Sequence, residues 1–148
     1  MQYLADTPDG AWAEFLRHEE ITDPDDLAGV DRNLWAVAVD EGGERIAEPA
    51  LELDVLTGDE NSYPGCQAAA GAYRQDGATA LLAPSAALVS GAARGQSVGD
   101  GALVESPARD GRVLVLFGPR SFLSGWLCAD GGRPSPRLLP LVRHFAGR

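Results

Sequence analysis

Residues 2–18 read QYLADTPDGAWAEFLRH, a stretch that predicts a short strand followed at once by a helix. Residues 2–5 form a short apolar segment, and Thr7-Pro8-Asp9 has the features of a helix start. Thr7 suits the N-cap and Pro8 the first helical position, while the carboxylate of Asp9 is favoured near the positive end of the helix dipole. The chain therefore opens on a unit that passes directly from strand to helix.

The helix is expected to run to about Glu20. Its apolar side chains recur at helical spacing and form one stripe, made of Ala11, Trp12, Phe15 and Leu16. Glu14, Arg17 and His18 fall off this stripe. Periodicity therefore places Glu14 outside the core, and two interpretations stay open. Glu14 is either a solvated residue that pairs with Arg17 or His18, or a catalytic carboxylate.

Further elements follow along the chain. Residues 34–39 form a continuous apolar run, which predicts a strand covered on both faces, and residues 112–117 predict a second buried strand. An Ala-rich helix is expected from Pro64 to Gly77. A strand over residues 78–83 should then end at a Pro84-Ser85-Ala86 turn.

The remaining segments complete the predicted architecture. Residues 89–111 are rich in Gly, Ala and Ser and predict a long loop with weak strand potential near residues 102–104, and residues 137–145 predict a terminal helix. The tryptophans are expected in the core. Strands and helices mix without strict alternation, so residues 1–148 are predicted to form one α+β domain with a mixed sheet.

Composition excludes several classes of function. With 148 residues, 45% of them hydrophobic, the chain fits one domain, and no apolar run is long enough to span a membrane, so we expect a cytoplasmic protein. The net charge is -10 and the chain has no Lys, which argues against nucleic acid as a direct ligand. Residues 1–60 hold 17 of the 22 acidic side chains and 3 of the 12 basic ones, so a small anionic ligand would be expected near the second half.

Familiar catalytic and metal-binding patterns are missing. The chain has no Gly-x-Ser-x-Gly elbow, no phosphate-binding Gly-rich loop ending in Lys and no paired-His helix. Cys66 and Cys128 are far apart and are expected to be reduced, partly buried thiols, and their spacing does not support a metal site. A looser set remains for chemistry: Tyr3, Glu14 and Ser85.

Two stretches of the sequence, YLADTPDGAWAEFLRH and GATALLAPSAAL, resemble the RES domain family, which is named for its Arg, Glu and Ser. The likeness extends from Gln2 to about Gly118 and continues through GWLCADGGRPSPRLLPLVRHF. It implies a fold similar to the diphtheria-toxin type of ADP-ribosyltransferase, with a mixed, mainly antiparallel sheet flanked by helices. It also implies that NAD is the substrate, because several members act as toxins of toxin–antitoxin pairs by consuming NAD.

The resemblance assigns expected roles to individual residues. The family Tyr, Glu and Ser match Tyr3, Glu14 and Ser85. Glu14 would stabilise the positive charge that develops on the ribose, Tyr3 would pack on the nicotinamide, and Ser85 would hydrogen-bond the ribose or carboxamide. The family Arg lies upstream of the Tyr and has no match, so Met1 is expected to be an internal start of a longer protein or the start of a natural short form. Arg120 is then a candidate for the pyrophosphate, with a solvent-facing arginine as the alternative.

Two functions follow as expectations. The first is cleavage of NAD at the nicotinamide–ribose bond by hydrolysis, phosphorolysis or ADP-ribosyl transfer, in a protein whose partner is a cognate antitoxin. The second is a catalytically inactive binding module of the same fold that binds an antitoxin or another protein through its acidic face. The oligomeric state stays open, a homo-oligomer included.

Overall fold

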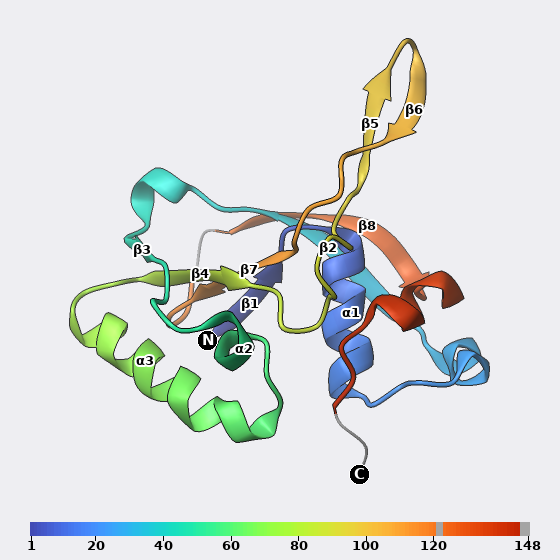
Figure 1. The fold of residues 1–148 in the computed structure, drawn as a ribbon. Coiled ribbons are helices and arrows are strands. Elements are labelled where there is room, and N and C mark those ends of the chain that lie inside the picture. Colours follow the sequence, from blue (N-terminus) through green and yellow to red (C-terminus); the bar gives the residue numbers. More distant parts are fainter. Residues whose placement is uncertain (121–122, 146–148) are drawn as a thin grey trace.

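A four-stranded sheet forms the centre of the structure, a computed structural model that describes residues 1–120 and 123–145 (Figure 1). Its strand order is β1-β7-β4-β3. The strands are β1 (Gln2–Ala5), β3 (Ile46–Ala47), β4 (Ala80–Pro84) and β7 (Arg112–Leu116). β7 runs antiparallel to β1 and β4, and β3 runs parallel to β4. The predicted α+β fold with a mixed, mainly antiparallel sheet is confirmed.

The register of this sheet decides which residues meet at its edges. Ala5 of β1 and Ala83 of β4 both lie opposite Val113 of β7. Because β1 and β4 are each antiparallel to β7, they point the same way and end at the same edge. The helix that follows β1 and the turn that follows β4 therefore start side by side, although they are far apart in sequence.

The helix after β1, α1 (Pro8–His18), begins as its sequence predicts. Thr7 is the N-cap, and its Oγ1 accepts a hydrogen bond of 3.0 Å from the backbone N–H of Gly10. This bond satisfies one of the amide groups that a helix start leaves without a partner. The N-terminal turn of α1 is therefore fixed against the end of β1.

Thr7→Ala is expected to lower the free energy of unfolding by about 1 kcal/mol, because the Gly10 N–H loses its side-chain acceptor. Urea denaturation monitored by circular dichroism measures this difference. Thr7→Ser keeps a hydroxyl in the same place and should retain most of the stability. Equal destabilisation by both substitutions would contradict the capping role.

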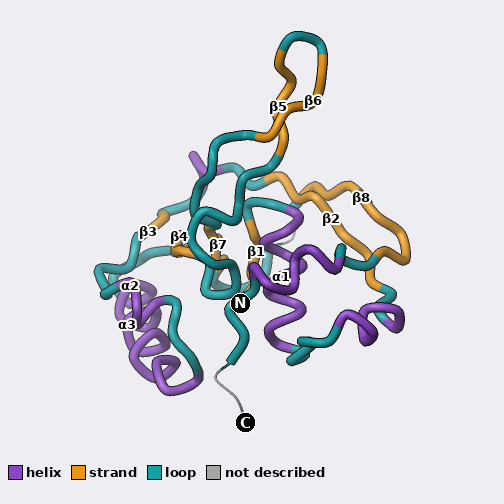
Figure 2. Tube along the Cα trace, turned by 45° about the vertical axis from the view of Figure 1, so that its right-hand side comes forward, coloured by secondary structure: helices purple, strands orange, loops and turns teal. Residues whose placement is uncertain are grey.

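The other helices and strands surround the central sheet. α2 (Leu53–Leu56) and α3 (Tyr63–Gln75) lie next to each other, apart from α1 (Figure 2). β5 (Gln96–Gly99) and β6 (Ala102–Glu105) form a hairpin that projects from the body of the molecule (Figure 1). The 3-10 helices are Pro24–Gly29, Glu41–Gly43, Glu60–Ser62 and Pro136–Leu141. Residues 89–111 were expected to form a long loop with weak strand potential near residues 102–104. Part of this segment forms the β5–β6 hairpin instead, and β6 includes residues 102–104.

The prediction of a strand covered on both faces at residues 34–39 is wrong. The strand exists as β2 (Arg32–Ala38), but it pairs with β8 (Ser124–Gly132) in a separate two-stranded sheet. Trp35 and Trp126 are 56% and 60% exposed there, so the expected core position of these two tryptophans is also wrong. An apolar run of strand length predicts a strand, but it does not indicate which sheet the strand joins.

The predicted terminal helix over residues 137–145 is replaced by a shorter 3-10 helix, Pro136–Leu141. Pro140 lies inside this helix and cannot donate a backbone hydrogen bond, which disfavours a regular α-helix. The chain then extends, and Val142 forms an antiparallel bridge with Leu88. The last described residues therefore run alongside the segment that follows β4.

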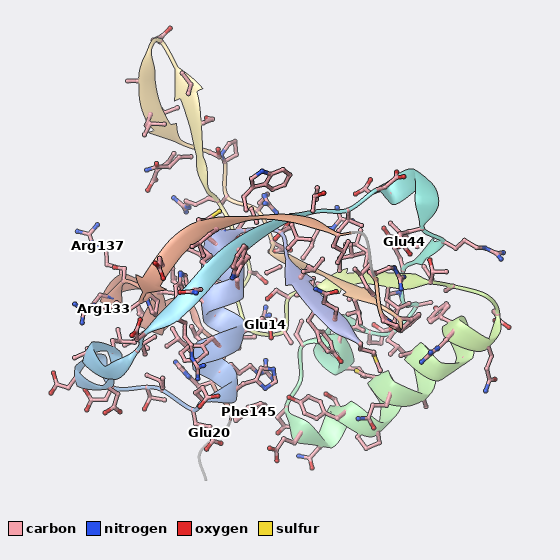
Figure 3. All side chains as sticks on the ribbon, turned by 180° about the vertical axis from the view of Figure 1, so that it is seen from behind. Glu14, Glu20, Glu44, Arg133, Arg137 and Phe145 are labelled. Carbon is pink, nitrogen blue, oxygen red and sulfur yellow. The ribbon has the colours of Figure 1, made fainter. Side chains whose placement is uncertain are left out.

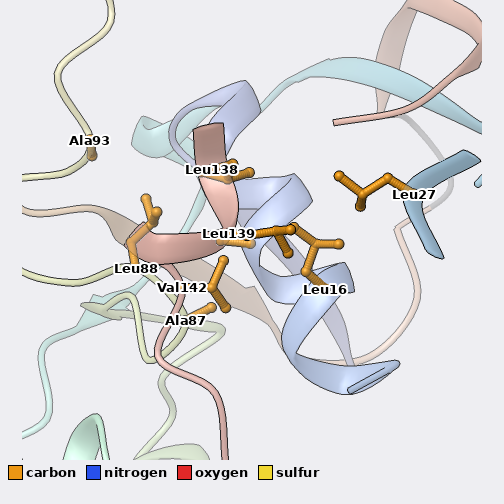
Figure 4. Close-up of a cluster of buried hydrophobic side chains, with 9 residues drawn as sticks. Leu16, Leu27, Ala87, Leu88, Ala93, Leu138, Leu139 and Val142 are labelled. Atoms are coloured by element: carbon orange, nitrogen blue, oxygen red, sulfur yellow. The ribbon is translucent and has the colours of Figure 1, made fainter. Parts of the chain in front are cut away.

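The core lies where α1, this C-terminal segment and the segment after β4 meet (Figure 4). Leu16, Leu88 and Leu116 are the largest fully buried side chains. The cluster around α1 consists of Ala13, Leu16, Leu27, Ala87, Leu88, Ala93, Leu138, Leu139 and Val142. α1 is thereby packed against residues 87–88, only two positions after Ser85.

In the ranges 1–120 and 123–145, no helix combines the length and the apolar character that crossing a bilayer would require.

Candidate functional site

Glu14 lies in the middle of α1 and faces the end of β4. Its Oε1 accepts a hydrogen bond of 3.4 Å from the Ser85 hydroxyl, and it also interacts with the backbone N–H of Ala87. The Glu14 side chain keeps 27% of its exposure, and Oε2 lies 3.8 Å from Nε2 of His18. Glu14, labelled in Figure 3, is therefore partly buried and neighbours both His18 and Ser85. Its catalytic role stays a prediction.

Ser85 is buried, with 3% exposure, and its hydroxyl has a defined orientation. Its Oγ accepts hydrogen bonds from the backbone N–H groups of Ala87, at 3.3 Å, and Leu88, at 3.2 Å. Because these two donors occupy the oxygen lone pairs, the hydroxyl proton is left for Glu14. The predicted turn after β4 thus presents a serine whose proton points at the carboxylate.

Gly111 allows this close arrangement. The backbone N–H of Ser85 donates to the Gly111 carbonyl at 2.8 Å. A Cβ atom at Gly111 would lie 3.1 Å from Cδ1 of Leu88 and 3.2 Å from Cβ of Ser85. Both contacts are tight, so a larger residue here would push the Ser85 turn away from Glu14.

Two tyrosines bear on this region, and one of them, Tyr63, lies close enough to Glu14 for their charges to interact. Tyr3 lies on β1 and is 66% exposed, so its ring is accessible to a ligand. Tyr63, at the start of α3, was not identified from the sequence. Burial raises the pKa of Tyr63, the positive charge of Arg17 acts against this, and the charges of Glu60, Glu14 and Tyr3 raise it further. Tyr63 therefore shares one electrostatic environment with Tyr3 and Glu14.

Arg17 is the second residue that sequence analysis missed. It was expected off the apolar stripe, yet it is buried, with 3% exposure. Its Nη1 donates a hydrogen bond to the carbonyl oxygen of Ala86, and its Nη2 donates one to the carbonyl oxygen of Gly58. Its guanidinium also lies 4.5 Å from the centre of the Phe145 ring. Arg17 therefore fastens three separate segments to α1.

Burial of Arg17 was not predicted because the buried face of α1 differs from the apolar face that the sequence indicates. The buried positions are Gly10, Ala13, Leu16 and Arg17, which follow helical spacing but include two very small residues. The predicted stripe is centred on the large side chains of Trp12 and Phe15, whereas the buried face includes Gly10 and Ala13, whose small size permits close packing of the helix. At about 100° per residue, the centre of the buried face is turned by roughly 140° from that of the predicted one.

Arg120 lies at the other edge of the sheet. Its Nε and Nη2 donate to the two carboxylate oxygens of Glu44 at 2.8 and 2.9 Å, and Nη2 also donates to the Thr79 carbonyl at 2.9 Å. These hydrogen bonds from Arg120 hold the pKa of Glu44 below its usual range. Thr79 precedes β4 and Ser85 follows it, so Arg120 lies at the opposite end of β4 from Ser85. The structure brings Glu14 and Ser85 into contact, whereas Tyr3 lies opposite Val115 in the sheet, level with Leu81 of β4.

An open pocket of about 420 Å³ adjoins Ser85. Arg143 and Arg112 contribute its positive charges, and Glu48 and Asp110 contribute its negative ones. Its apolar wall consists of Leu51, Leu53, Leu56, Leu82 and Leu88. Ser85 therefore lines the pocket and also contacts Glu14.

In the described part of the chain, metal ligands do not cluster and the cysteines do not pair. No group of three or more His, Cys, Asp or Glu side chains there is placed to hold a metal ion. Both cysteines are free thiols; Cys66 is half-buried, whereas Cys128 is exposed, contrary to the expectation of partial burial.

Comparison with known proteins identifies the family. The model of the RES domain matches residues 1–124. The chain belongs to the RES domain family. No curated protein and no solved structure matches the chain significantly. The RES match includes Tyr3, Glu14 and Ser85, whereas Arg143 lies beyond it. Membership of the RES family is consistent with a toxin-like protein that acts on NAD.

The raised pKa of Glu14 predicts a specific pH dependence of stability. Burial is the main cause of the rise, opposed by the charges of His18 and Arg17 and by the Ser85 hydrogen bond. A carboxyl group whose pKa is higher in the folded state favours folding at low pH, and this contribution is lost as the pH rises through the folded-state value. Glu14→Gln removes the titration, so its stability relative to the unsubstituted protein should increase from acidic to neutral pH.

Urea denaturation of both proteins between pH 3.5 and 7 measures this difference. The scan brackets the ordinary carboxyl value of 4.5. Glu19→Gln, on the exposed end of the same helix, is the matched control. A Glu14→Gln protein whose stability falls relative to the unsubstituted protein between pH 3.5 and 7 would contradict a raised pKa.

Proposed function

We propose that the chain cleaves NAD at the bond between nicotinamide and ribose. The observation that carries the proposal is the contact between Glu14 and Ser85: a partly buried carboxylate with raised pKa is fixed by a serine hydroxyl next to an open pocket. The match to the RES domain family supports NAD as the substrate.

Glu14 would act on the ribose. As the glycosidic bond breaks, nicotinamide leaves with the bonding electron pair, and positive charge develops on the ribose carbon and ring oxygen. A carboxylate in a partly dry site stabilises such charge more strongly than one in water. The raised pKa also makes Glu14 a better acceptor for the proton that an attacking hydroxyl releases.

Ser85 and Tyr3 would position the substrate. Ser85 lines the pocket and its hydroxyl contacts Glu14, so it is suited to hold the carboxylate in place beside the pocket without becoming the nucleophile. The exposed ring of Tyr3 would cover the nicotinamide. Water as the acceptor gives ADP-ribose, phosphate gives its phosphorylated form, and a macromolecule would become ADP-ribosylated.

The biological setting that fits this activity is a toxin–antitoxin pair in the cytoplasm. Uncontrolled loss of NAD would be harmful to the cell that makes the enzyme, which favours a protein partner that blocks the site. The acidic first 60 residues, with 17 acidic side chains, would suit a basic surface on that partner.

The test is nicotinamide release by the full chain incubated with NAD, followed by chromatography of the products with and without phosphate in the buffer. Nicotinamide with equal amounts of ADP-ribose is the expected result for hydrolysis, and a phosphorylated product that appears only with phosphate indicates phosphorolysis. Failure to release nicotinamide under all these conditions would overturn the proposal.

The second candidate is a non-catalytic binding module. The exposed β2–β8 sheet favours it, because Trp35 and Trp126 are more than half exposed and aromatic side chains are enriched at protein interfaces. Calorimetry with NAD separates the two functions: measurable affinity for NAD supports the enzyme, whereas its absence together with absent turnover supports the binding module.

A further inference from the structure

Arg143 joins the C-terminal segment to the turn that carries Ser85. Its backbone N–H donates to the Ala87 carbonyl, Nη1 donates to the Ser85 carbonyl at 3.0 Å, and Nη2 donates to the Ser90 hydroxyl at 3.3 Å. A guanidinium carries five N–H donors. The side chain of Arg143 thus keeps donors available while it lines the pocket beside Ser85.

The charge of Arg143 is poorly neutralised. Burial lowers the pKa of Arg143, the positive charge of Arg17 lowers it further, and Asp110 acts against both. Within residues 1–120 and 123–145, no carboxylate forms an ion pair with its guanidinium, and the Asp110 carboxylate accepts a hydrogen bond from the Gly91 N–H at 2.8 Å. Arg120 differs, since it is paired with Glu44 through two hydrogen bonds. Among the residues that the structure describes, Arg143 is therefore a half-buried cation whose guanidinium has no ion-pair partner.

Arg112 adds a second positive charge to the same pocket. Its Nη2 lies 3.6 Å from the Glu48 carboxylate, with 52% of the Arg112 side chain and 75% of the Glu48 side chain exposed. Exposed ion pairs of this kind contribute little. An anionic ligand could therefore displace Glu48 from Arg112 at small cost.

We propose that Arg143 and Arg112 form a diphosphate-binding subsite in the pocket beside Ser85. The inference rests on the proposed function and deepens it, because the diphosphate of NAD would then lie next to the Glu14–Ser85 pair. Planar guanidinium groups bind phosphate oxygens through paired hydrogen bonds, and the uncompensated charge of Arg143 supplies the attraction. The subsite draws one cation from β7 and one from the C-terminal segment.

Calorimetry of the full chain with inorganic pyrophosphate and with ADP-ribose tests the subsite. The unsubstituted protein should bind both, and Arg143→Gln should weaken both affinities about tenfold or more, since hydrogen bonds to charged groups are lost. Arg137→Gln, in the exposed part of the C-terminal segment, is the control and should bind as before. Pyrophosphate that does not bind, or binds equally to Arg143→Gln, would overturn the inference.

Arg143 also donates a hydrogen bond to the Ser85 carbonyl, so Arg143→Gln could unfold the protein for reasons unrelated to ligand binding. A second variant therefore tests the subsite without breaking this hydrogen bond. Arg112→Gln alters an exposed end of its side chain and should weaken pyrophosphate binding severalfold with an unchanged melting temperature. If Arg143→Gln unfolds, the Arg112→Gln result decides: unchanged pyrophosphate affinity refutes the subsite, and weakened affinity supports it.

The outcomes separate the subsite from the proposed function. Pyrophosphate binding that depends on Arg143, in a protein that releases no nicotinamide, would refute NAD cleavage and retain the subsite. Nicotinamide release with the same KM for NAD and the same pyrophosphate affinity in Arg143→Gln would retain the enzyme and refute the subsite.

Discussion

Glu14→Gln is expected to reduce nicotinamide release from NAD by about 100- to 1,000-fold. Glutamine has the shape of glutamate and still accepts a hydrogen bond from Ser85, but its neutral amide cannot stabilise positive charge on the ribose or take up a proton. The loss should appear in kcat, because the missing interaction is made in the transition state. Steady-state kinetics by chromatography of nicotinamide measures it.

The matched control is Glu19→Gln, which makes the same chemical change at the exposed C-cap of α1. Its turnover should equal that of the unsubstituted protein. Circular dichroism confirms that both variants fold. A folded Glu14→Gln protein with undiminished turnover would exclude Glu14 as the catalytic carboxylate.

Arg17→Met is expected to lower the free energy of unfolding by about 2–4 kcal/mol. Methionine keeps an apolar stem of similar length but leaves the Ala86 and Gly58 carbonyl oxygens without their donor. The stacking of the guanidinium on Phe145 is lost as well. In a chain of this size, the melting temperature should fall by roughly 2–4 °C per kcal/mol.

Two comparisons refine this prediction. Arg17→Lys keeps the charge but not the forked geometry that reaches two carbonyl groups at once, so its stability should lie between those of the unsubstituted protein and Arg17→Met. Arg137→Met, at an exposed position, should be neutral. Denaturation curves in urea report all three, and an Arg17→Met protein as stable as Arg137→Met would show that the buried guanidinium contributes nothing.

Features set by local chemistry could be predicted from the sequence. The start of α1 follows from Thr7 and Pro8, and β4 and β7 follow from short apolar runs bounded by turns. Glu14 and Ser85 were expected to act together from the family resemblance, and the common direction of β1 and β4 explains how the fold places them in contact.

Features that depend on packing between distant segments could not be predicted. Arg17 and Arg143 take their roles from carbonyl groups 69 and 58 residues away, and no local pattern records such partners. β2 has the composition of a buried strand, yet its pairing with β8 leaves it outside the central sheet. Periodicity describes one element at a time, whereas these positions depend on which elements meet.

The antiparallel bridge between Leu88 and Val142 has a consequence for how the protein is made. A ribosome adds residues from the N-terminus onward, so Glu14 and Ser85 exist well before the segment that holds Ser85 in place. Until Val142 and Arg143 have left the ribosome, the Ser85 carbonyl has no guanidinium and residues 87–88 lack their neighbour in the core. The Ser85 turn therefore reaches the arrangement described above only after residues 142 and 143 have been made and released from the ribosome.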